Sequence, residues 1–128
     1  MDAAATVRDY YEALRRGEPL YPYFAEDPDV VKVGVRERLV GYDAVAEGLR
    51  EQSRRTDDWT VESRDLRVHE RGDHVAFADV VRLSWRDVVA DRTYDLDTRW
   101  TGTLEAREDD GERSWLFVGM HVSAPWES

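Results

Sequence analysis

The sequence predicts an α+β domain in which N-terminal helices pack on one face of a bent antiparallel sheet. Two observations lead to this fold class. Helical spacing of apolar residues is confined to the first part of the chain, and long segments of alternating apolar and polar residues fill the rest. The length of 128 residues suits one domain with one core, so residues 1–128 are predicted to form a single domain.

Three helices are expected in the N-terminal part. Asp2 can cap a first helix that Gly17 ends, and Val7, Tyr10, Tyr11 and Leu14 share one face of it. Residues 20–25 are short, aromatic and interrupted by proline, which indicates a short second helix or a turn. A third helix is expected near residues 43–54, after a valine-rich strand at residues 29–35 that contains Lys32.

The remaining segments alternate as antiparallel strands do. Trp59 and Val61 occupy odd-numbered positions, whereas Leu66 and Val68 occupy even-numbered ones. An extra residue in the strand would put all four on the same face of the sheet, so a bulge is expected near Arg64. Strands follow at residues 74–85 and 93–107, and an acidic turn at residues 108–112 leads into a last strand at residues 114–125.

The last strand is apolar on both faces. Strict alternation places Trp115, Phe117, His121 and Ser123 on one face. The opposite face then carries an apolar row of Leu116, Val118, Met120 and Val122. Because monomers avoid large exposed apolar patches, this row predicts a homodimer formed through the outer face of the sheet.

Composition narrows the possible surroundings and partners. The chain has 28 acidic and 18 basic residues, a net charge of −10, and Lys32 is its one lysine. An acid-rich, lysine-poor surface is typical of proteins from salt-loving organisms, and a merely acidic protein is the alternative. The charge disfavours nucleic acid as a partner. Neither a membrane span nor a signal peptide is recognisable, so a cytoplasmic location is expected.

Four stretches, in order, resemble the nuclear transport factor 2-like superfamily and, within it, the SnoaL-like group. The resemblance implies a cone-shaped domain whose strongly curved sheet wraps around a pocket, commonly in a dimer. The ending is also similar to the association domain of calcium/calmodulin-dependent kinases. The stretches are residues 10–18, residues 24–31 with 41–45, Arg99-Trp100-Thr101, and Trp115 with His121-Val122-Ser123-Ala124-Pro125.

Steroid Δ-isomerases of the same superfamily offer a comparison of chemistry. Tyr10 matches their first-helix tyrosine, which the resemblance implies as an oxyanion-hole donor. Lys32 stands where they have a carboxylate base, and Thr101 or Thr103 stands where an aspartate is expected. This particular isomerase activity is therefore not expected.

Two residues are candidates for acid–base chemistry. His121 could be a general acid or base, because histidine is the residue type whose unperturbed pKa lies near neutrality. A core histidine bonded to Ser123 or to the backbone is the alternative. Asp79 interrupts an apolar face, where it could act as an acid or base or simply pair with an arginine.

Five more residues are candidates for ligand binding. Arg99 could hold an anion or form an internal ion pair, and Arg82 could face a pocket or lie exposed on the sheet. Tyr10, Thr101 and Ser123 would supply hydroxyl groups.

No metal or cofactor is expected, because the histidines lack metal-ligand spacing, cysteine is absent and no glycine-rich phosphate loop occurs. Because no convincing acid–base pair is recognisable, the sequence favours a non-catalytic pocket protein of the SnoaL-like type, a binding or assembly domain that takes up a small-molecule ligand or a partner. A small acid–base enzyme of isomerase, cyclase or hydratase type, acting on a hydrophobic metabolite, is the alternative.

Overall fold

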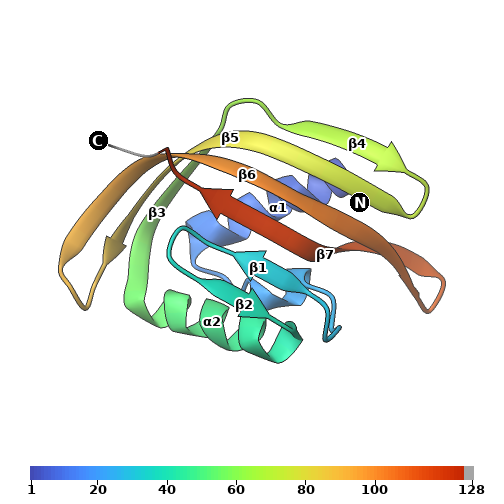
Figure 1. The fold of residues 1–128 in the computed structure, drawn as a ribbon, viewed down its shortest axis with the longest axis horizontal. Helices are drawn as coiled ribbons and strands as arrows, with labels where there is room; N and C mark the ends of the chain where they lie inside the picture. The colour runs from blue at the N-terminus through green and yellow to red at the C-terminus, as the bar shows by residue number, and fades with distance from the viewer. Residues whose placement is uncertain (126–128) are drawn as a thin grey trace.

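The computed structural model describes residues 1–125 and shows an α+β fold with an arched, open sheet (Figure 1). Helix α1 (Ala3–Arg16) begins at Asp2, whose Oδ1 accepts a 2.7 Å hydrogen bond from the backbone of Ala5. It ends at Gly17, where φ is +69°, a conformation that glycine adopts without strain. The predicted first helix is confirmed at both ends.

The prediction of three helices is wrong. Residues 1–125 contain two α-helices, α1 and α2 (Tyr42–Arg55). Within residues 20–25 the chain forms only a single 3₁₀ turn, η1 (Tyr21–Tyr23). Pro22 lies inside this turn and supplies no backbone N–H, and Pro19 precedes it, so an α-helix cannot propagate through the segment. Phe24 leaves the turn in an extended conformation and lies buried beside Phe117.

The described part of the chain forms one sheet of seven strands, and most of the strand pairs are antiparallel. The strand order is β2-β1-β7-β6-β5-β3, with β4 also pairing with β5, and the pairing of β1 with β7 is parallel. The strands are β1 (Val31–Val33), β2 (Arg38–Val40), β3 (Thr56–Ser63), β4 (Arg67–Arg71), β5 (His74–Asp87), β6 (Arg92–Asp109) and β7 (Glu112–Ser123). The sequence indicated β1 but not β2, and the hairpin of these two short strands forms one edge of the sheet.

The bulge predicted near Arg64 is confirmed by the register. Ser63 pairs with Val81 and Arg67 pairs with Ala78, so this segment carries one more residue than β5 over the same distance. An extra residue reverses the parity of the side chains, which explains why Val61 and Val68 can both lie toward the core.

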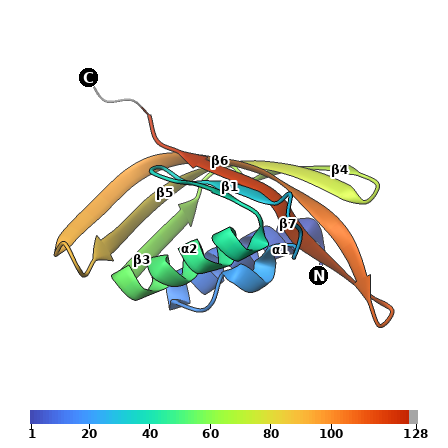
Figure 2. The ribbon, with the colours of Figure 1, turned by 60° about the horizontal axis from the view of Figure 1, so that its bottom comes forward.

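Both helices lie on the concave side of the sheet (Figure 2). Between them and the sheet is a core that includes Tyr10, Phe24, Leu49, Leu104 and Phe117, each at most 2% exposed. The described residues include no helix long and apolar enough to cross a membrane.

The predicted faces of the last strand are wrong over half of its length. Leu104 pairs with Phe117 while Thr103 pairs with Gly119, so β7 has an extra residue, Val118, at this point. Beyond the bulge the parity is reversed, and Met120 and Val122 are buried in the core together with Phe117. The continuous apolar outer row that the sequence predicted therefore does not exist.

Candidate functional site

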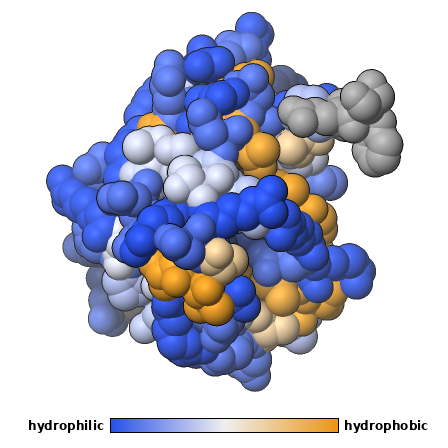
Figure 3. Space-filling model, turned by 90° about the vertical axis from the view of Figure 1, so that its left-hand side faces the viewer, coloured by the Kyte–Doolittle hydropathy of each residue, from blue (hydrophilic) through white to orange (hydrophobic). Residues whose placement is uncertain are grey.

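An open cleft of about 1260 Å³ lies between the concave face of the sheet, helix α2 and the β1–β2 hairpin. Its lining residues come from both helices, from the turn between β1 and β2, and from strands β1, β3, β5, β6 and β7. Figure 3 views the molecule from the side of the β5–β6 hairpin, where hydrophobic residues group within a largely hydrophilic surface. The residues that line the cleft include Tyr10, Leu14, Lys32, Glu37, Trp59, Leu83, Trp85, Tyr94, Trp100 and Val122.

Tyr10 is the polar residue that α1 contributes to the cleft. Its ring packs edge-on against Trp100 and Phe117, and only 2% of the residue is exposed. Burial raises the pKa of the hydroxyl well above its usual value, and the nearby charge of Glu37 raises it further. The hydroxyl therefore stays protonated at neutral pH and can donate a hydrogen bond to a ligand.

An ion pair borders the same cleft. Lys32, on β1, is 5% exposed, and its Nζ donates a 3.0 Å hydrogen bond to Oε1 of Glu37 in the adjoining turn. The Glu37 side chain is 40% exposed, so one partner is buried and the other meets solvent. A buried ammonium, a partly exposed carboxylate and the Tyr10 hydroxyl together provide donors and an acceptor for a polar group of a ligand.

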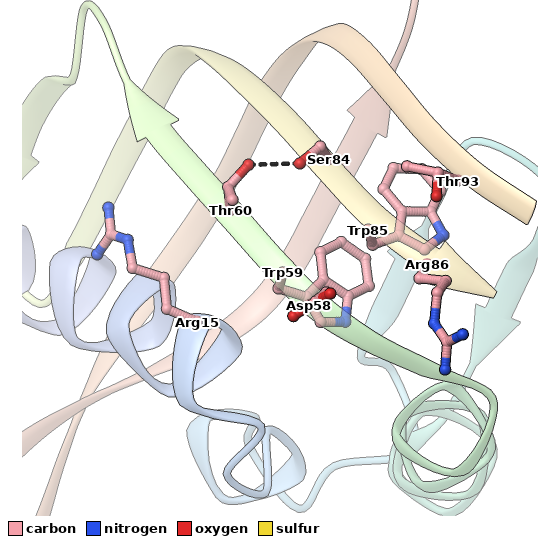
Figure 4. A pocket seen from close by; sticks show the side chains of 8 residues that line it. All are labelled: Arg15, Asp58, Trp59, Thr60, Ser84, Trp85, Arg86 and Thr93. Atoms are coloured by element: carbon pink, nitrogen blue, oxygen red, sulfur yellow. Dashed lines mark hydrogen bonds between the residues drawn. The ribbon is translucent and has the colours of Figure 1, made fainter. Parts of the chain in front are cut away.

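Stacked aromatic rings form another wall of the cleft. Trp85 stacks on Trp59 with ring centroids 4.9 Å apart, and on its cross-strand partner Tyr94 at 5.1 Å. The two tryptophans also line a smaller hollow of about 430 Å³ beside β3, where Thr60 and Ser84 are hydrogen-bonded at 2.6 Å (Figure 4). They thus border both hollows.

Of the residues that the sequence singled out, Tyr10 and Arg82 border the cleft. Arg82 is engaged within the protein, since its Nε lies 2.8 Å from Asp95 and its Nη1 lies 3.0 Å from Asp97. The sequence offered an arginine that faces a pocket or one that lies exposed on the sheet. The structure has Arg82 at the border of the cleft with both carboxylates as partners, a pairing that the sequence suggested for Arg99 instead.

Arg99, Thr101, His121 and Ser123 lie together, but on the other face of the sheet. Arg99 pairs with Ser123 and Thr101 with His121 across β6 and β7, while the intervening Trp100 and Val122 face the core. None of the four lines the cleft. His121 is exposed rather than packed beside Trp115 and Phe117, because the bulge at Val118 turned its side chain outward.

Asp79 is buried, at 4% exposed, and does not line the cleft. Its Oδ2 accepts hydrogen bonds from the Tyr11 hydroxyl at 2.8 Å and the Ser63 hydroxyl at 2.6 Å, and its Oδ1 accepts one from the backbone of Asp65 at 3.0 Å. These contacts join α1, β3, β5 and the β3–β4 connection, so the carboxylate acts as a structural acceptor in this geometry.

Sequence reasoning did not include Lys32 and Glu37 among the site residues. One signal pointed to them: the single lysine of the chain stands between two valines in a short strand, where an ammonium group needs a partner. Residues 1–125 contain no cluster of three or more histidine or carboxylate side chains that could hold a metal ion.

Residues 3–127 match the family model described as the SnoaL-like domain. A nuclear transport factor 2-like superfamily protein from Salmonella enterica serovar Typhimurium superposes with a TM-score of 0.80 at 15% identity, covering 97% of this chain and 89% of that one. A proposed dehydratase of the same family from Streptomyces avermitilis gives 0.80 at 18% identity, covering 97% and 94%.

A proposed calcium/calmodulin-dependent protein kinase II association domain from Xanthomonas campestris gives a TM-score of 0.75 at 22% identity, covering 98% of this chain and 86% of that one. No curated protein matches the sequence. At these identities the solved structures establish a common fold and leave the chemistry of the cleft to its own residues.

Proposed function

The chain belongs to the SnoaL-like domain family, and from this premise we propose that its cleft binds a small, partly apolar molecule. The observation that carries the proposal is the meeting of Tyr10, Lys32 and Glu37 in an aromatic-walled cleft of about 1260 Å³. Binding sites for small molecules combine such apolar walls with a few polar groups that fix orientation. A ligand carbonyl or hydroxyl oxygen would accept from the Tyr10 hydroxyl or the Lys32 ammonium group.

A neutral aromatic ketone, 2-acetonaphthone, is a suitable probe, because Trp59, Trp85 and Trp100 line the cleft and their fluorescence reports occupancy. We expect saturable quenching in the wild type and a loss of affinity of about threefold to tenfold in Tyr10→Phe, the effect of one neutral hydrogen bond. Tyr21→Phe is the matched control, since Tyr21 does not line the cleft. Equal affinities in the wild type and Tyr10→Phe, or no binding of the ketone, would contradict the proposal.

A second candidate function is acid–base catalysis on such a ligand, and the Lys32–Glu37 pair favours it. Glu37 would remove a proton from the carbon next to a carbonyl group. The Tyr10 hydroxyl and the Lys32 ammonium group would stabilise the enolate oxygen that forms, and the proton would return from Glu37 to another position of the ligand. This is the proton transfer of an isomerase and the first step of many eliminations.

The catalytic candidate is tested by exchange of the methyl protons of 2-acetonaphthone for deuterium in D₂O, followed by NMR. Wild-type protein should accelerate exchange over buffer, and Glu37→Gln should reduce this acceleration by about a hundredfold or more. Glu12→Gln, on the exposed surface of α1, is the control. Exchange at the buffer rate in the presence of the wild type, with the ketone bound, would restrict the function to binding.

The proposal includes self-association through the outer face of the sheet. That face retains Val80, which is 41% exposed, and the half-buried Leu116, although Met120 and Val122 lie inside. Light scattering at micromolar concentration should give twice the mass of the chain, and Val80→Glu should shift the population toward the monomer because it places a charge in the contact. A monomeric mass for the wild type would remove this part of the proposal.

A further inference from the structure

Two arginines converge on one tyrosine ring at the mouth of the cleft. Arg36 belongs to the turn between β1 and β2, and Arg92 begins β6. Their guanidinium carbons lie 5.2 Å and 5.1 Å from the centroid of the Tyr94 ring. Tyr94 is itself stacked on Trp85, and all four residues line the cleft. Segments distant in sequence thus bring two positive charges to one aromatic platform.

No ion pair joins either of these guanidinium groups to a carboxylate among the side chains that the structure describes. Such unpaired guanidinium groups stand out in a chain with 28 acidic and 18 basic residues. Two cations near one ring also repel each other, and the ring quadrupole offsets this repulsion only in part. Both groups therefore have N–H donors that remain available to a ligand at the mouth of the cleft.

The other cations of the cleft are already neutralised. Lys32 is bound to Glu37 at 3.0 Å, Arg55 lies 3.6 Å from Asp87, and Arg82 holds Asp95 and Asp97. An anion entering the cleft would compete with a carboxylate at each of these positions. At Arg36 and Arg92 it would meet no such competitor, so the mouth is the place where the cleft can bind a negative charge.

We propose that Arg36, Arg92 and Tyr94 form a subsite for the carboxylate of an aromatic or conjugated acid whose apolar body extends into the cleft. The inference rests on the proposed function and adds the ligand class to it. The two guanidinium groups bind the carboxylate through charge-assisted hydrogen bonds. The apolar body lies along the wall formed by Trp85 and Trp100, and the far end of the ligand reaches Lys32 and Tyr10.

The test compares two probes that share a ring system and differ in charge, 2-naphthoate and 2-acetonaphthone, by tryptophan fluorescence. The double variant Arg36→Gln/Arg92→Gln should bind 2-naphthoate about tenfold or more weakly than the wild type. Its affinity for the neutral ketone should stay within about twofold, which also shows that the cleft is intact. Raising sodium chloride from about 0.05 M to about 0.5 M should weaken binding of the acid and spare the ketone.

The charge-matched control is Arg8→Gln/Arg71→Gln, which also removes two positive charges, from arginines that lie outside the cleft. It should bind both probes as the wild type does. If both double variants lose affinity for the acid equally, the effect is one of net charge and the subsite is disproved. Equal affinity of the wild type and Arg36→Gln/Arg92→Gln for 2-naphthoate would overturn the inference while leaving the binding function intact. Failure of the wild type to bind either probe would overturn both.

Discussion

Lys32 Nζ lies 3.0 Å from Glu37 Oε1, and the two side chains differ sharply in burial, at 7% and 40% exposed. The lysine stands between Val31 and Val33 in β1 and cannot reach solvent as freely as its partner. The turn after β1 brings the Glu37 carboxylate back to the Lys32 ammonium group. The short hairpin thus provides a partner for a buried charge.

Removing the carboxylate should therefore cost more than removing the lysine. Glu37→Gln leaves a buried ammonium group with only an amide as acceptor, and we expect it to lower the free energy of unfolding by about 1–3 kcal/mol. Lys32→Met replaces the charge by an apolar chain of similar length and should be neutral or stabilising. Urea unfolding of both variants measures the difference. A larger loss in Lys32→Met than in Glu37→Gln would contradict this account of the pair.

The Asp79 carboxylate should matter for stability and not for binding. Asp79→Asn keeps the shape of the side chain but replaces one acceptor oxygen by an NH₂ donor. In one orientation of the amide this donor meets the hydroxyl groups of Tyr11 and Ser63, and in the other it meets the backbone N–H of Asp65. We expect a loss of about 1–3 kcal/mol in the free energy of unfolding. Asp91→Asn, whose side chain is 90% exposed, is the control and should change it little. Unaltered stability of Asp79→Asn would show that the network is not structural.

Alkaline pH should destabilise the protein through its buried tyrosines. Burial is the main cause that raises the pKa of Tyr10 and of Tyr11, and a hydrogen bond to Asp79 adds to the rise for Tyr11. An unfolded tyrosine loses its proton near pH 10, so above that pH the unfolded state binds fewer protons than the folded state and the free energy of unfolding falls.

The contribution of each buried tyrosine to the free energy of unfolding is present in full below about pH 10. Above that pH it falls by about 1.4 kcal/mol per pH unit. Denaturant unfolding at several pH values between about 8 and 11 measures the slope. Tyr10→Phe should flatten it by the share of one tyrosine. A slope unchanged by this substitution would mean that Tyr10 ionises alike in the folded and unfolded states.

Much of the fold was predictable because its signals are local. The first helix could be predicted from Asp2 at its start, its apolar face and Gly17 at its end. The buried face of β5 could be predicted from the alternation of apolar residues along that strand. The bulge near Arg64 was also predictable, since apolar residues on either side of it stand on opposite parities and polar residues fill the other positions.

The bulge at Val118 left no such signal. Before it, Trp115 and Phe117 alternate with Leu116 and Val118, so both parities are apolar. A change of parity that brings Met120 and Val122 into the core therefore cannot be recognised from the sequence. The sequence therefore placed His121 and Ser123 in a pocket, together with their cross-strand partners on β6. In the structure all four residues lie on the outer face of the sheet. The ion pair of Lys32 with Glu37 was hidden for another reason: it depends on a turn between strands of three residues, too short to show alternation.

The acidic surface should make stability depend on salt. With a net charge of −10, lowering the ionic strength lengthens the range over which the carboxylates repel one another. The melting temperature should rise by roughly 5 °C or more between dilute buffer and molar potassium chloride. The triple variant Glu70→Gln/Glu108→Gln/Glu112→Gln should have a higher melting temperature in dilute buffer and a smaller response to salt. A wild-type melting temperature indifferent to salt would refute the prediction of a salt-adapted surface.

Gly102, on β6, is a position where the core tolerates no side chain. A Cβ atom there would lie 2.5 Å from the carbonyl oxygen of Gly119 and 2.6 Å from Cε1 of Phe77. The first contact is with backbone of the neighbouring strand, and the second is with a ring that is itself 3% exposed and packed against Phe117. Moving the Phe77 ring away would disturb its packing against Phe117 in the core.

Gly102→Ala should therefore lower the free energy of unfolding by about 1–3 kcal/mol, despite the gain that alanine normally brings by restricting the unfolded chain. Gly119→Ala is the matched control on the adjacent strand, because a Cβ atom there would meet only the carbonyl oxygen of Val31 at 4.0 Å. It should leave stability unchanged or raise it by about 0.4–1 kcal/mol. Urea unfolding of both variants gives the comparison, and equal stabilities would show that β6 and β7 can separate at this point more easily than their packing implies.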